Sequence, residues 1–344
     1  MPVWLIRAGS HGEYERKFLQ EGRVYLTWEN LAENLGRFPD RAAILAATAR
    51  LYPDAKPRRL QNWASQIWSF AHEIKEGDLV ILPLKRQPAI CIGEVTGDYK
   101  FEGGGPDPFF HWRCVKWIAD AVPRAHFGKD LLFSFGAFLT ICRIQRNSAE
   151  ARLAAMRASN WEPETLVASI TTNASVIDEA GEETDLQELA RDQIARLISS
   201  RFKGHGLARL VEGILKAQGY TTYCSPEGPD DSVDIVAGAG PLGFGSPRLC
   251  VQVKSQDTPV ESKELNELRG AMQRVRATEG LFVSWGGFKT TIQRHTAESF
   301  FAVRLWTQRE LLEALFAHYD QLGDDLKAEL PLKRFWTVAL PDEE

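Results

Sequence analysis

The chain has 344 residues, of which 44% are hydrophobic and 25% are charged, and this composition excludes wholesale disorder. No apolar run approaches the roughly 20 residues that span a bilayer, and the first residues, MPVWLIRAG, lack the flanks of a signal peptide. We therefore expect a cytoplasmic protein with no membrane partner. Five scattered cysteines without a C-x-x-C pair argue against a disulfide framework and a structural zinc site.

The net charge of −5 is unevenly distributed along the chain. Residues 1–146 carry +4, residues 147–190 carry −7, residues 191–300 carry +2 and residues 301–344 carry −4. Binding to phosphate needs clustered cations and not a basic total, so this balance permits DNA binding through local patches. At about 150 residues per domain, we predict a domain at 1–146, an acidic linker with a helix at 147–190, and a second domain at 191–344.

Residues 1–146 have the pattern of a strand-rich unit with a few helices. Segments with helical spacing predict helices over 40–53, which Asp40 can cap, and over 62–74. Short apolar or alternating runs predict strands at 3–8, 23–28, 77–85, 89–99 and 111–118. Because no β-α-β rhythm is visible, we predict a small β-barrel with helices.

The linker and the second domain follow a different pattern. Between Ile177 and Glu188 the chain has six acidic residues and Gly181, which is typical of a solvated linker. The order α-β-β-β-α-β-α then predicts an α/β core with helices on both faces of one sheet. The predicted helices are 190–202, 207–218, 261–277, one within 286–301, and 308–319, and the predicted strands are 220–224, 232–238, 248–256, 279–285 and 302–307.

Three polar residues on two of these predicted strands form a candidate catalytic group. Asp234 lies in one strand, and Gln252 and Lys254 follow 18 and 20 positions later. Side chains at i and i+2 of a strand share a face, so Gln252 and Lys254 project together. If the two strands pair as a hairpin, Asp234 lies beside them, and a carboxylate, an amide oxygen and an ammonium converge.

This set of groups suits the hydrolysis of a phosphodiester. Hard oxygen ligands hold Mg²⁺, which polarises the phosphate and activates water, while a lysine stabilises the developing charge. Glu212 in the preceding helix can add a second carboxylate, although a solvated helix face is the ordinary explanation. His205 and His295 are isolated in the sequence and lack the partners of a catalytic relay.

The second domain resembles the Mrr-like branch of the PD-(D/E)xK restriction endonuclease superfamily. The resemblance covers about residues 190–310 and rests on Glu212, the GPDDSVDI segment, the Q-V-K strand, KSQ at 254–256 and the later Gly-Gly-Phe segment. It implies a restriction-endonuclease-like α/β sandwich with Asp234 and Gln252 as metal ligands, Lys254 as the catalytic lysine, Glu212 as a helix acid, and Mg²⁺ or Mn²⁺ as cofactor. Glutamine is common at position 252 in this branch but leaves one fewer negative ligand, and Ser232 stands where many relatives have glycine.

The first domain has features of a module that inspects DNA. Six of the ten tryptophans fall within its first 120 residues, and GDLVILPLK with AICIGEVTGDYKF resembles the strand pair of the PUA/EVE-like superfamily. That resemblance implies a pocket for a modified base. The pocket candidates, each of which could instead be core, are Trp28, Trp63 and Tyr99. The candidates for contact with the DNA backbone, against the alternative of ordinary surface charge, are Arg58, Arg59, Lys85 and Arg86.

Together these features predict an α+β multidomain, metal-dependent DNA endonuclease of the restriction or anti-phage type. We expect it to be modification-dependent, to act on double-stranded DNA and to form a homodimer or higher homo-oligomer, because one site per chain must cut two strands. A catalytically inactive nucleic-acid-binding sensor and an RNA-directed nuclease are the alternatives. The chain lacks the G-x-x-x-x-G-K-[ST] motif, so it has no P-loop motor of its own.

Overall fold

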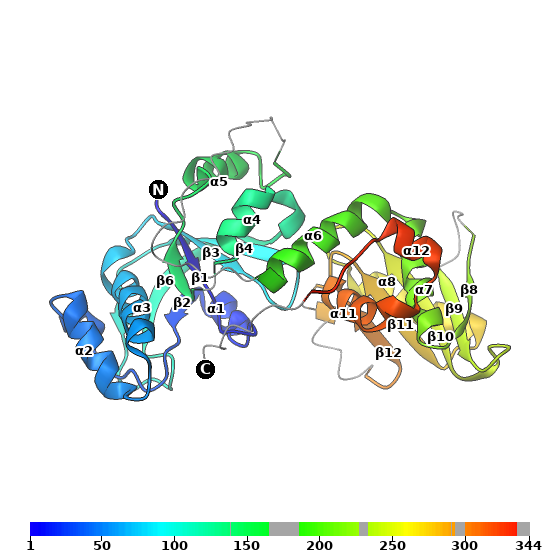
Figure 1. The fold of residues 1–344 in the computed structure, drawn as a ribbon, viewed down its shortest axis with the longest axis horizontal. Coiled ribbons are helices and arrows are strands. Elements are labelled where there is room, and N and C mark those ends of the chain that lie inside the picture. The colour runs from blue at the N-terminus through cyan, green and yellow to red at the C-terminus, as the bar shows by residue number, and fades with distance from the viewer. Residues whose placement is uncertain (138, 165–185, 227–232, 290, 293–299, 336–344) are drawn as a thin grey trace. The chain divides into compact units, whose positions relative to one another are not determined.

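The computed structural model describes residues 1–137, 139–164, 186–226, 233–289, 291–292 and 300–335 (Figure 1). Two compact units comprise the described residues of Met1–Leu189 and of Ala190–Leu340. The domain limits that the sequence suggested remain predictions. Among the helices of the described part, none is both long enough and apolar enough to cross a membrane.

The first unit is built on a seven-stranded sheet that curls into a half-barrel. Its strand order is β2-β6-β4-β3-β1-β7, with β5 paired to β6, and every pairing is antiparallel except that of β1 with β3. The strands are β1 (Val3–Ile6), β2 (Arg23–Leu26), β3 (Leu79–Pro83), β4 (Ala89–Val95), β5 (Lys100–Phe101), β6 (His111–Pro123) and β7 (Ile141–Arg143). The helices are α1 (Glu15–Glu21), α2 (Arg41–Leu51), α3 (Pro57–Trp68), α4 (Lys129–Phe135) and α5 (Ala149–Ala158), with short turns η1 (Leu35–Arg37), η2 (Ser69–Glu73) and η3 (Arg124–His126).

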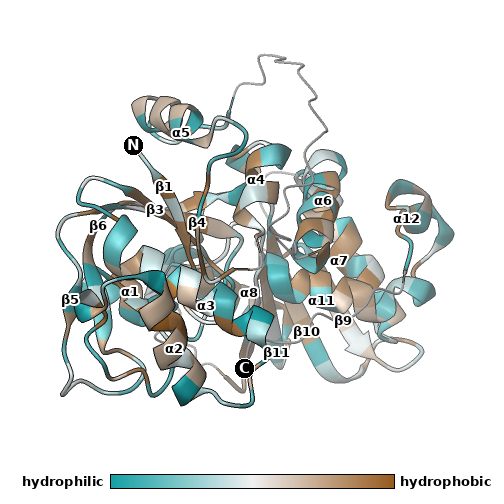
Figure 2. Ribbon diagram, turned by 60° about the vertical axis from the view of Figure 1, so that its left-hand side comes forward, coloured by the Kyte–Doolittle hydropathy of each residue, from teal (hydrophilic) through white to brown (hydrophobic). Residues whose placement is uncertain are grey.

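The central strands of this sheet are buried on both faces. Along β1, Trp4 and Ile6 belong to one hydrophobic core, and Val3 and Leu5 belong to another. This explains why β1, β3 and β4 are almost continuously apolar, and Figure 2 shows hydrophobic colours along β3 and β4. Helices α4 and α5 contribute to the second core, so they cover a face that would meet solvent in a small barrel. The structure therefore supports a mixed α+β unit, with a curled sheet in place of a closed barrel.

The helix predicted over 62–74 changes its winding part-way. Helix α3 ends at Trp68, and Ser69–Glu73 continues as a π-helix. The buried guanidinium of Arg113 donates through Nε to the carbonyl of Phe70 at 2.8 Å and through Nη2 to that of Ala71 at 3.0 Å. The wider turn thus gains a tertiary partner from β6, which periodicity in the sequence cannot reveal.

His111 is a fully buried histidine in the first unit and makes the stability of this unit depend on pH. Tyr99 Oη lies 2.8 Å from its Nδ1, and its Nε2 lies 2.6 Å from the carbonyl of Leu31. Burial lowers the pKa of His111 to about 4, so the folded state favours the neutral ring. The resulting stability is present above the unfolded pKa of about 6.5 and is lost as the pH falls through the folded pKa.

We expect the free energy of unfolding to fall by about 3 kcal/mol between about pH 6.5 and pH 4 because of this histidine. Thermal or urea unfolding across this range tests the expectation. The His111→Gln variant takes up no proton at this position, so the step should disappear from its pH profile. If the free energy of unfolding fell equally at acid pH in the wild type and in His111→Gln, another group would be responsible for the loss of stability.

The second unit has a five-stranded sheet with helices on both faces, as the sequence predicted. The strand order is β12-β11-β10-β9-β8, with β8, β9 and β10 antiparallel and β10, β11 and β12 parallel. The strands are β8 (Thr221–Cys224), β9 (Ile235–Ala239), β10 (Gly245–Lys254), β11 (Glu279–Ser284) and β12 (Val303–Trp306). The helices are α6 (Leu186–Arg201), which begins in the first unit, α7 (His205–Ala217), α8 (Ser262–Val275), α11 (Gln308–His318) and α12 (Asp324–Glu329), with the turn η4 (Tyr319–Gln321).

Strand β10 separates the two cores of this unit. Val251 lies in the core that α7 and α11 cover, and Cys250 lies in the core that α8 covers. The alternation along one central strand therefore decides which side chains meet which helix layer. The helix predicted within 286–301 falls mostly outside the described residues.

Candidate functional site

The start of β9 and the end of β10 bring Asp234 next to Gln252. Val251 is the register partner of Ile235, and the amide of Asp234 donates to the carbonyl of Val251 at 3.0 Å. One position further along this antiparallel pairing, Asp234 stands opposite Gln252. The amide of Val253 donates to Asp234 Oδ2 at 2.6 Å, which fixes the carboxylate against β10.

Gln252 and Lys254 lie on the same side of the sheet, at the end of β10 next to Asp234. Val251 and Val253 belong to the core under α7, so the alternate positions Gln252 and Lys254 project toward the α8 side. On β9, Ile235 lies in the α7 core and Val236 contacts the α8 core, but Val233 just before the strand also lies in the α8 core, so the alternation does not extend to Asp234. Gln252 and Lys254 share one face, and the hydrogen bond from the Val253 amide holds the Asp234 carboxylate beside them at the end of β10.

The polar atoms of this group are poorly solvated. Gln252 is only 3% exposed, and its Oε1 is buried without a hydrogen-bond partner in the part of the chain that the structure describes. Burial raises the pKa of the half-buried Asp234 carboxyl, while the Val253 amide and the charges of Lys254 and His205 act in the opposite direction. A buried amide oxygen without a donor is costly, which suggests that another group satisfies it.

This donor set fits a hard divalent cation with few protein ligands. A carboxylate oxygen and an amide oxygen are the ligand types that Mg²⁺ and Mn²⁺ accept, and Mg²⁺ usually keeps several waters. Within the described ranges, no group of three or more His, Cys, Asp or Glu side chains could hold a metal ion. Among the described residues at this end of β10, Asp234 and Gln252 offer oxygen atoms that could serve as ligands.

Replacing Gln252 by methionine, whose side chain has a similar length, should change protein stability and metal affinity in opposite directions. Gln252→Met removes the oxygen that has no described partner, so we expect the free energy of unfolding to rise by about 1–3 kcal/mol. Affinity for Mn²⁺ should fall in the same variant. Denaturant unfolding and calorimetric Mn²⁺ titration measure the two effects, with the exposed Gln256→Met as control. A loss of stability with unchanged Mn²⁺ binding would contradict this account.

Glu212 has other partners in the structure. It lies on α7, where its Oε1 accepts a hydrogen bond from Thr222 Oγ1 at 2.8 Å and forms an ion pair with Lys216 at 3.0 Å. Thr222 pairs with Ala237, whose side chain faces the α7 core. These contacts hold the Glu212 carboxylate on the α7 side of β8, and burial together with the charges of both Glu212 and Asp234 raises the pKa of Cys224. The catalytic role of Glu212 remains a prediction.

His205, which is isolated in the sequence, is linked to Asp234 through Ser225. Its Nε2 is 2.7 Å from the carbonyl of Ser225, and the amide of Ser225 donates to the carbonyl of Asp234 at 2.8 Å. The charge of His205 also lowers the pKa of Asp234. The signal in the sequence was Gly204-His205-Gly206 at the start of the first core helix. The GPDDS part of the predicted motif lies largely outside the described residues.

Comparison with known proteins assigns this part of the chain. Residues 199–315 match a family model described as restriction endonuclease. The second unit is therefore similar to this restriction endonuclease family. The match spans the three residues that the sequence placed at the centre of the site. Residues 4–129 match a family described as a domain of unknown function (DUF8426), so the PUA/EVE-like resemblance remains a prediction.

Solved structures give more distant likenesses. A crystal structure of a protein of unknown function, AF1548, is 17% identical with a TM-score of 0.25, and the match covers 33% of this chain and 65% of that chain. The DNA modification-dependent restriction endonuclease AspBHI is 14% identical with a TM-score of 0.33, and the match covers 80% of this chain and 74% of that chain. The restriction endonuclease MspJI in complex with a 27-mer oligonucleotide is 14% identical with a TM-score of 0.32, and the match covers 95% of this chain and 79% of that chain. No curated protein matches the chain significantly.

In the first unit, the predicted base-pocket residues are largely core residues. Trp28 and Trp63 are buried in the main hydrophobic core of the first unit, and Trp63 packs edge-on against Tyr52. Tyr99 is half-buried and accepts a hydrogen bond from the amide of Leu35 at 3.1 Å, and burial raises its pKa to about 12. These contacts account for the three aromatic side chains as packing, and their role in a pocket stays a prediction.

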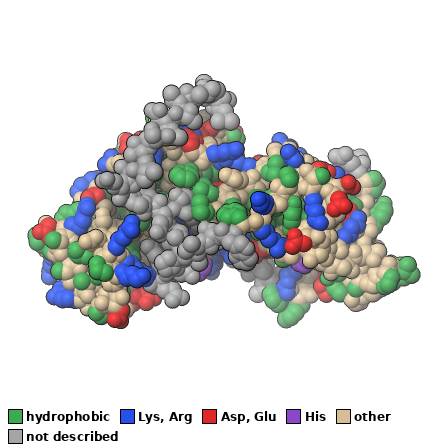
Figure 3. All heavy atoms as spheres, in the orientation of Figure 1, with side chains coloured by type: hydrophobic (Ala, Val, Ile, Leu, Met, Phe, Trp, Pro, Cys, Tyr) green, Lys and Arg blue, Asp and Glu red, His purple; other side chains and the backbone are tan. Residues whose placement is uncertain are grey.

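The predicted cations for the DNA backbone are not one group in the structure. Arg58 and Arg86 are exposed, and the guanidinium of Arg59 lies 4.5 Å from the centre of the Trp63 ring. Lys85 is half-buried and forms an ion pair with Glu188 at 2.8 Å. On the face in Figure 3, the described Lys and Arg side chains are scattered among acidic and apolar ones. Contact with phosphate by these residues remains a prediction.

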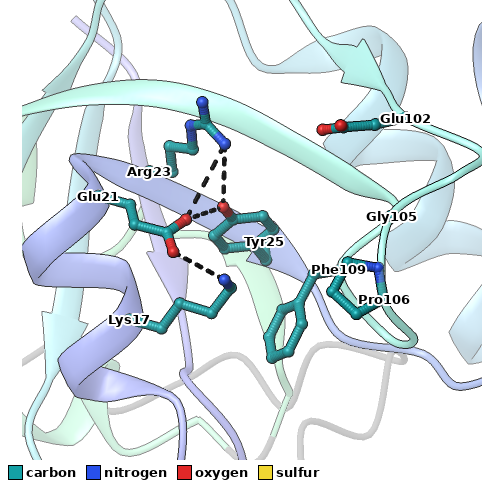
Figure 4. A pocket seen from close by; sticks show the side chains of 8 residues that line it. All are labelled: Lys17, Glu21, Arg23, Tyr25, Glu102, Gly105, Pro106 and Phe109. Carbon is teal, nitrogen blue, oxygen red and sulfur yellow. Dashed lines mark hydrogen bonds and ion pairs between the residues drawn. The ribbon is translucent and has the colours of Figure 1, made fainter.

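A cavity of about 450 Å³ lies elsewhere in the first unit. In Figure 4, Glu21 is linked to Lys17, Arg23 and Tyr25 on one wall, while Pro106 and Phe109 form the other. Lys17 pairs with Glu21 at 2.7 Å and lies 4.7 Å from the centre of the Phe109 ring. This volume is within the range of small-molecule sites. Its lining does not include Trp28, Trp63 or Tyr99.

Proposed function

We propose that this chain is a DNA endonuclease of the restriction type that depends on Mg²⁺ or Mn²⁺. The observation that carries the proposal is the pairing of Asp234 with Gln252, whose buried Oε1 has no partner among the described residues, beside Lys254. The family match over residues 199–315 supports the same assignment. A bound divalent cation would polarise the scissile phosphate and lower the pKa of a bound water.

The side chains of this site have separate tasks in the proposal. Asp234 and Gln252 bind the cation, and the hydrogen bond from the Val253 amide orients the carboxylate for that purpose. Lys254 stabilises the negative charge that develops on the phosphate. Its backbone is held firmly, because it is the register partner of Ser284 and its carbonyl accepts from the Trp285 amide at 2.8 Å. Among the described residues, the Lys254 ammonium has no hydrogen bond or ion pair, so it is available to the substrate.

The first unit acts in this proposal as the part that inspects the DNA and selects modified bases. Its cavity supports this role, because the half-buried Phe109 offers aromatic surface and Lys17 and Arg23 offer positive charge beside it. A role in defence against phage DNA follows from selective cleavage of modified DNA. Cutting both strands with one site per chain requires two chains, so light scattering on the protein with DNA should report a dimer or larger assembly.

The test is a nicking assay on duplexes that differ only in cytosine modification. We expect cleavage to need Mg²⁺ or Mn²⁺ and to depend on the modification. The same assay on RNA separates a DNA enzyme from an RNA-directed one. Equal cleavage of modified and unmodified DNA would remove the modification dependence but leave the nuclease in place. Activity that persists in a chelator would contradict the proposed site.

A second candidate is a nucleic-acid-binding sensor whose nuclease domain is inactive. The observation that favours it is the amide at position 252, which leaves Asp234 as the single carboxylate of the described site. Calorimetric titration with Mn²⁺ discriminates between the two. An active site should bind the ion and lose it in Asp234→Ala, whereas a sensor should bind DNA equally well with and without the ion.

A further inference from the structure

Three cations of the first unit converge on one carboxylate that comes from the acidic linker. Glu188 lies in the first turn of α6, and its Oε1 is 2.9 Å from Arg124 Nη1. Its Oε2 is 2.8 Å from Lys85 Nζ and 3.6 Å from Arg7 Nη1. Burial would raise the pKa of this carboxyl, but the charges of Arg124, Arg7 and Lys85 hold it well below its usual range.

The topology of the sheet gathers these cations at one edge. Arg7 follows β1, Lys85 follows β3 and Arg124 follows β6. Strands β1 and β3 are parallel, and β6 runs in the same direction because β4 is antiparallel to both β3 and β6. The carboxyl ends of the three strands therefore meet at the same edge. The cations come together because of the strand order, whether or not Glu188 is present.

The donors at this edge exceed what the Glu188 carboxylate uses. Arg7 is buried, and its Nη2 donates to the carbonyls of Phe135 and Ala137, at 3.2 and 2.8 Å. Its Nε is also buried, yet it has no acceptor in the described part of the chain. The nearby carboxyl of Glu15 accepts a hydrogen bond from the Lys85 backbone amide. A tetrahedral phosphate has more acceptor oxygens than a carboxylate and suits such a set.

Besides Glu188, Leu189 also holds the start of α6 at this edge, because it lies beside Gly136. Leu186 is 51% exposed, and Gln187 is exposed. The first buried residue of the helix is Ala195, which belongs to the core of the second unit. The first turn of α6 is thus held by the ion pairs of Glu188 and by Leu189, and an anion can compete with Glu188 for the cations.

We infer that Arg7, Lys85 and Arg124 form a binding site for a phosphate oxyanion, which Glu188 of the linker occupies in the structure. Glu188 acts as an internal substitute for the phosphate, and displacement of the first turn of α6 opens the site. The phosphate comes from the DNA backbone or from a free phosphate-bearing molecule. The first source rests on the proposed function, and the second does not.

The experiment compares Glu188→Gln with the wild-type chain and with a matched control. Glu150→Gln removes the same charge from an exposed ion pair of the first unit, where Glu150 binds Arg143 and the N-terminus. Melting temperatures are measured in inorganic phosphate and in chloride at equal ionic strength. We expect phosphate to raise the melting temperature of Glu188→Gln but not that of the wild type or of Glu150→Gln. Adding Arg124→Gln to Glu188→Gln should abolish the rise.

Binding of a fluorescent duplex in the absence of divalent metal then identifies the source of the phosphate. If it is the DNA backbone, Glu188→Gln should bind DNA roughly tenfold more tightly than Glu150→Gln. The slope of the logarithm of its binding constant against the logarithm of the salt concentration should also be steeper by about one. Unchanged DNA binding together with the phosphate effect points to a free phosphate-bearing molecule. Either result supports the oxyanion site.

A response to phosphate that is the same in Glu188→Gln, Glu150→Gln and the wild type would overturn the inference. Glu188→Asp, which keeps the charge but shortens the side chain, gives a second test if Glu188→Gln does not fold, and it should show a smaller phosphate effect. The phosphate measurement does not involve cleavage. Failure of the oxyanion site and failure of the proposed nuclease activity can therefore be told apart.

Discussion

Replacing Lys254 by alanine is expected to lower the rate of DNA cleavage by about a hundredfold or more, with little change in DNA affinity. The ammonium at the end of β10 contributes mainly where negative charge develops on the phosphate, and the loss of one such stabilising group typically costs about two to three orders of magnitude in rate. Single-turnover cleavage of a modified duplex measures the rate, and fluorescence anisotropy without metal measures the affinity.

The pH profile offers a further readout for this variant. Lys254 lowers the pKa of Asp234, so its loss should raise that pKa further. Any residual activity that needs an ionised Asp234 should then move to higher pH. The control is Lys263→Ala, because Lys263 is 85% exposed on α8 and its only described ion pair is with Glu267. Full cleavage activity in Lys254→Ala would exclude this lysine from the site.

Replacing Asp234 by asparagine is expected to abolish metal-dependent cleavage without destabilising the protein. The uncharged amide is a much weaker ligand for a hard cation, so both Mn²⁺ binding and activity should be lost. The side-chain oxygen of asparagine can still accept the hydrogen bond from the Val253 amide. The local structure therefore does not depend on the negative charge.

The sign of the stability change follows from the pKa of Asp234. Burial raises this pKa, so the folded state binds the proton more tightly than the unfolded state does. The stability from this group is fully present below its unfolded pKa and is lost as the pH rises through its folded pKa. At neutral pH the ionised carboxylate costs stability, and Asp234→Asn should melt at the same temperature or higher.

Melting curves and calorimetric Mn²⁺ titrations test both parts together. Asp325→Asn, at an exposed position of α12, controls for the loss of one negative charge in the second unit. A variant that melts well below the wild type would mean that Asp234 is structural. Metal binding that persists in a stable Asp234→Asn would move the cation to other ligands.

Several features of the first unit could not be predicted from its sequence. The apolar runs at 3–8 and 77–85 predicted strands, but the same runs did not reveal that β1 and β3 are parallel and buried on both faces. Aromatic residues were the best signal for a base pocket, yet Trp28 and Trp63 are part of the core. The composition shows that aromatic side chains are present. Whether such a side chain lies in the core or lines a pocket depends on which helices and strands cover it.

For the candidate site, the local pattern of the sequence determined the identity of the residues and the shared face of Gln252 and Lys254, because alternation along one strand has a period of two. Only the tertiary structure decided the rest. The pairing of β9 with β10 brings Asp234 opposite Gln252, and the packing of α7 links His205 to Asp234 through Ser225 and pairs Glu212 with Thr222 and Lys216. The meeting of Glu188 with Arg7, Lys85 and Arg124 joins positions far apart in the chain. Such contacts arise from strand order and register, which depend on the packing of the whole unit and leave no periodic trace in the sequence.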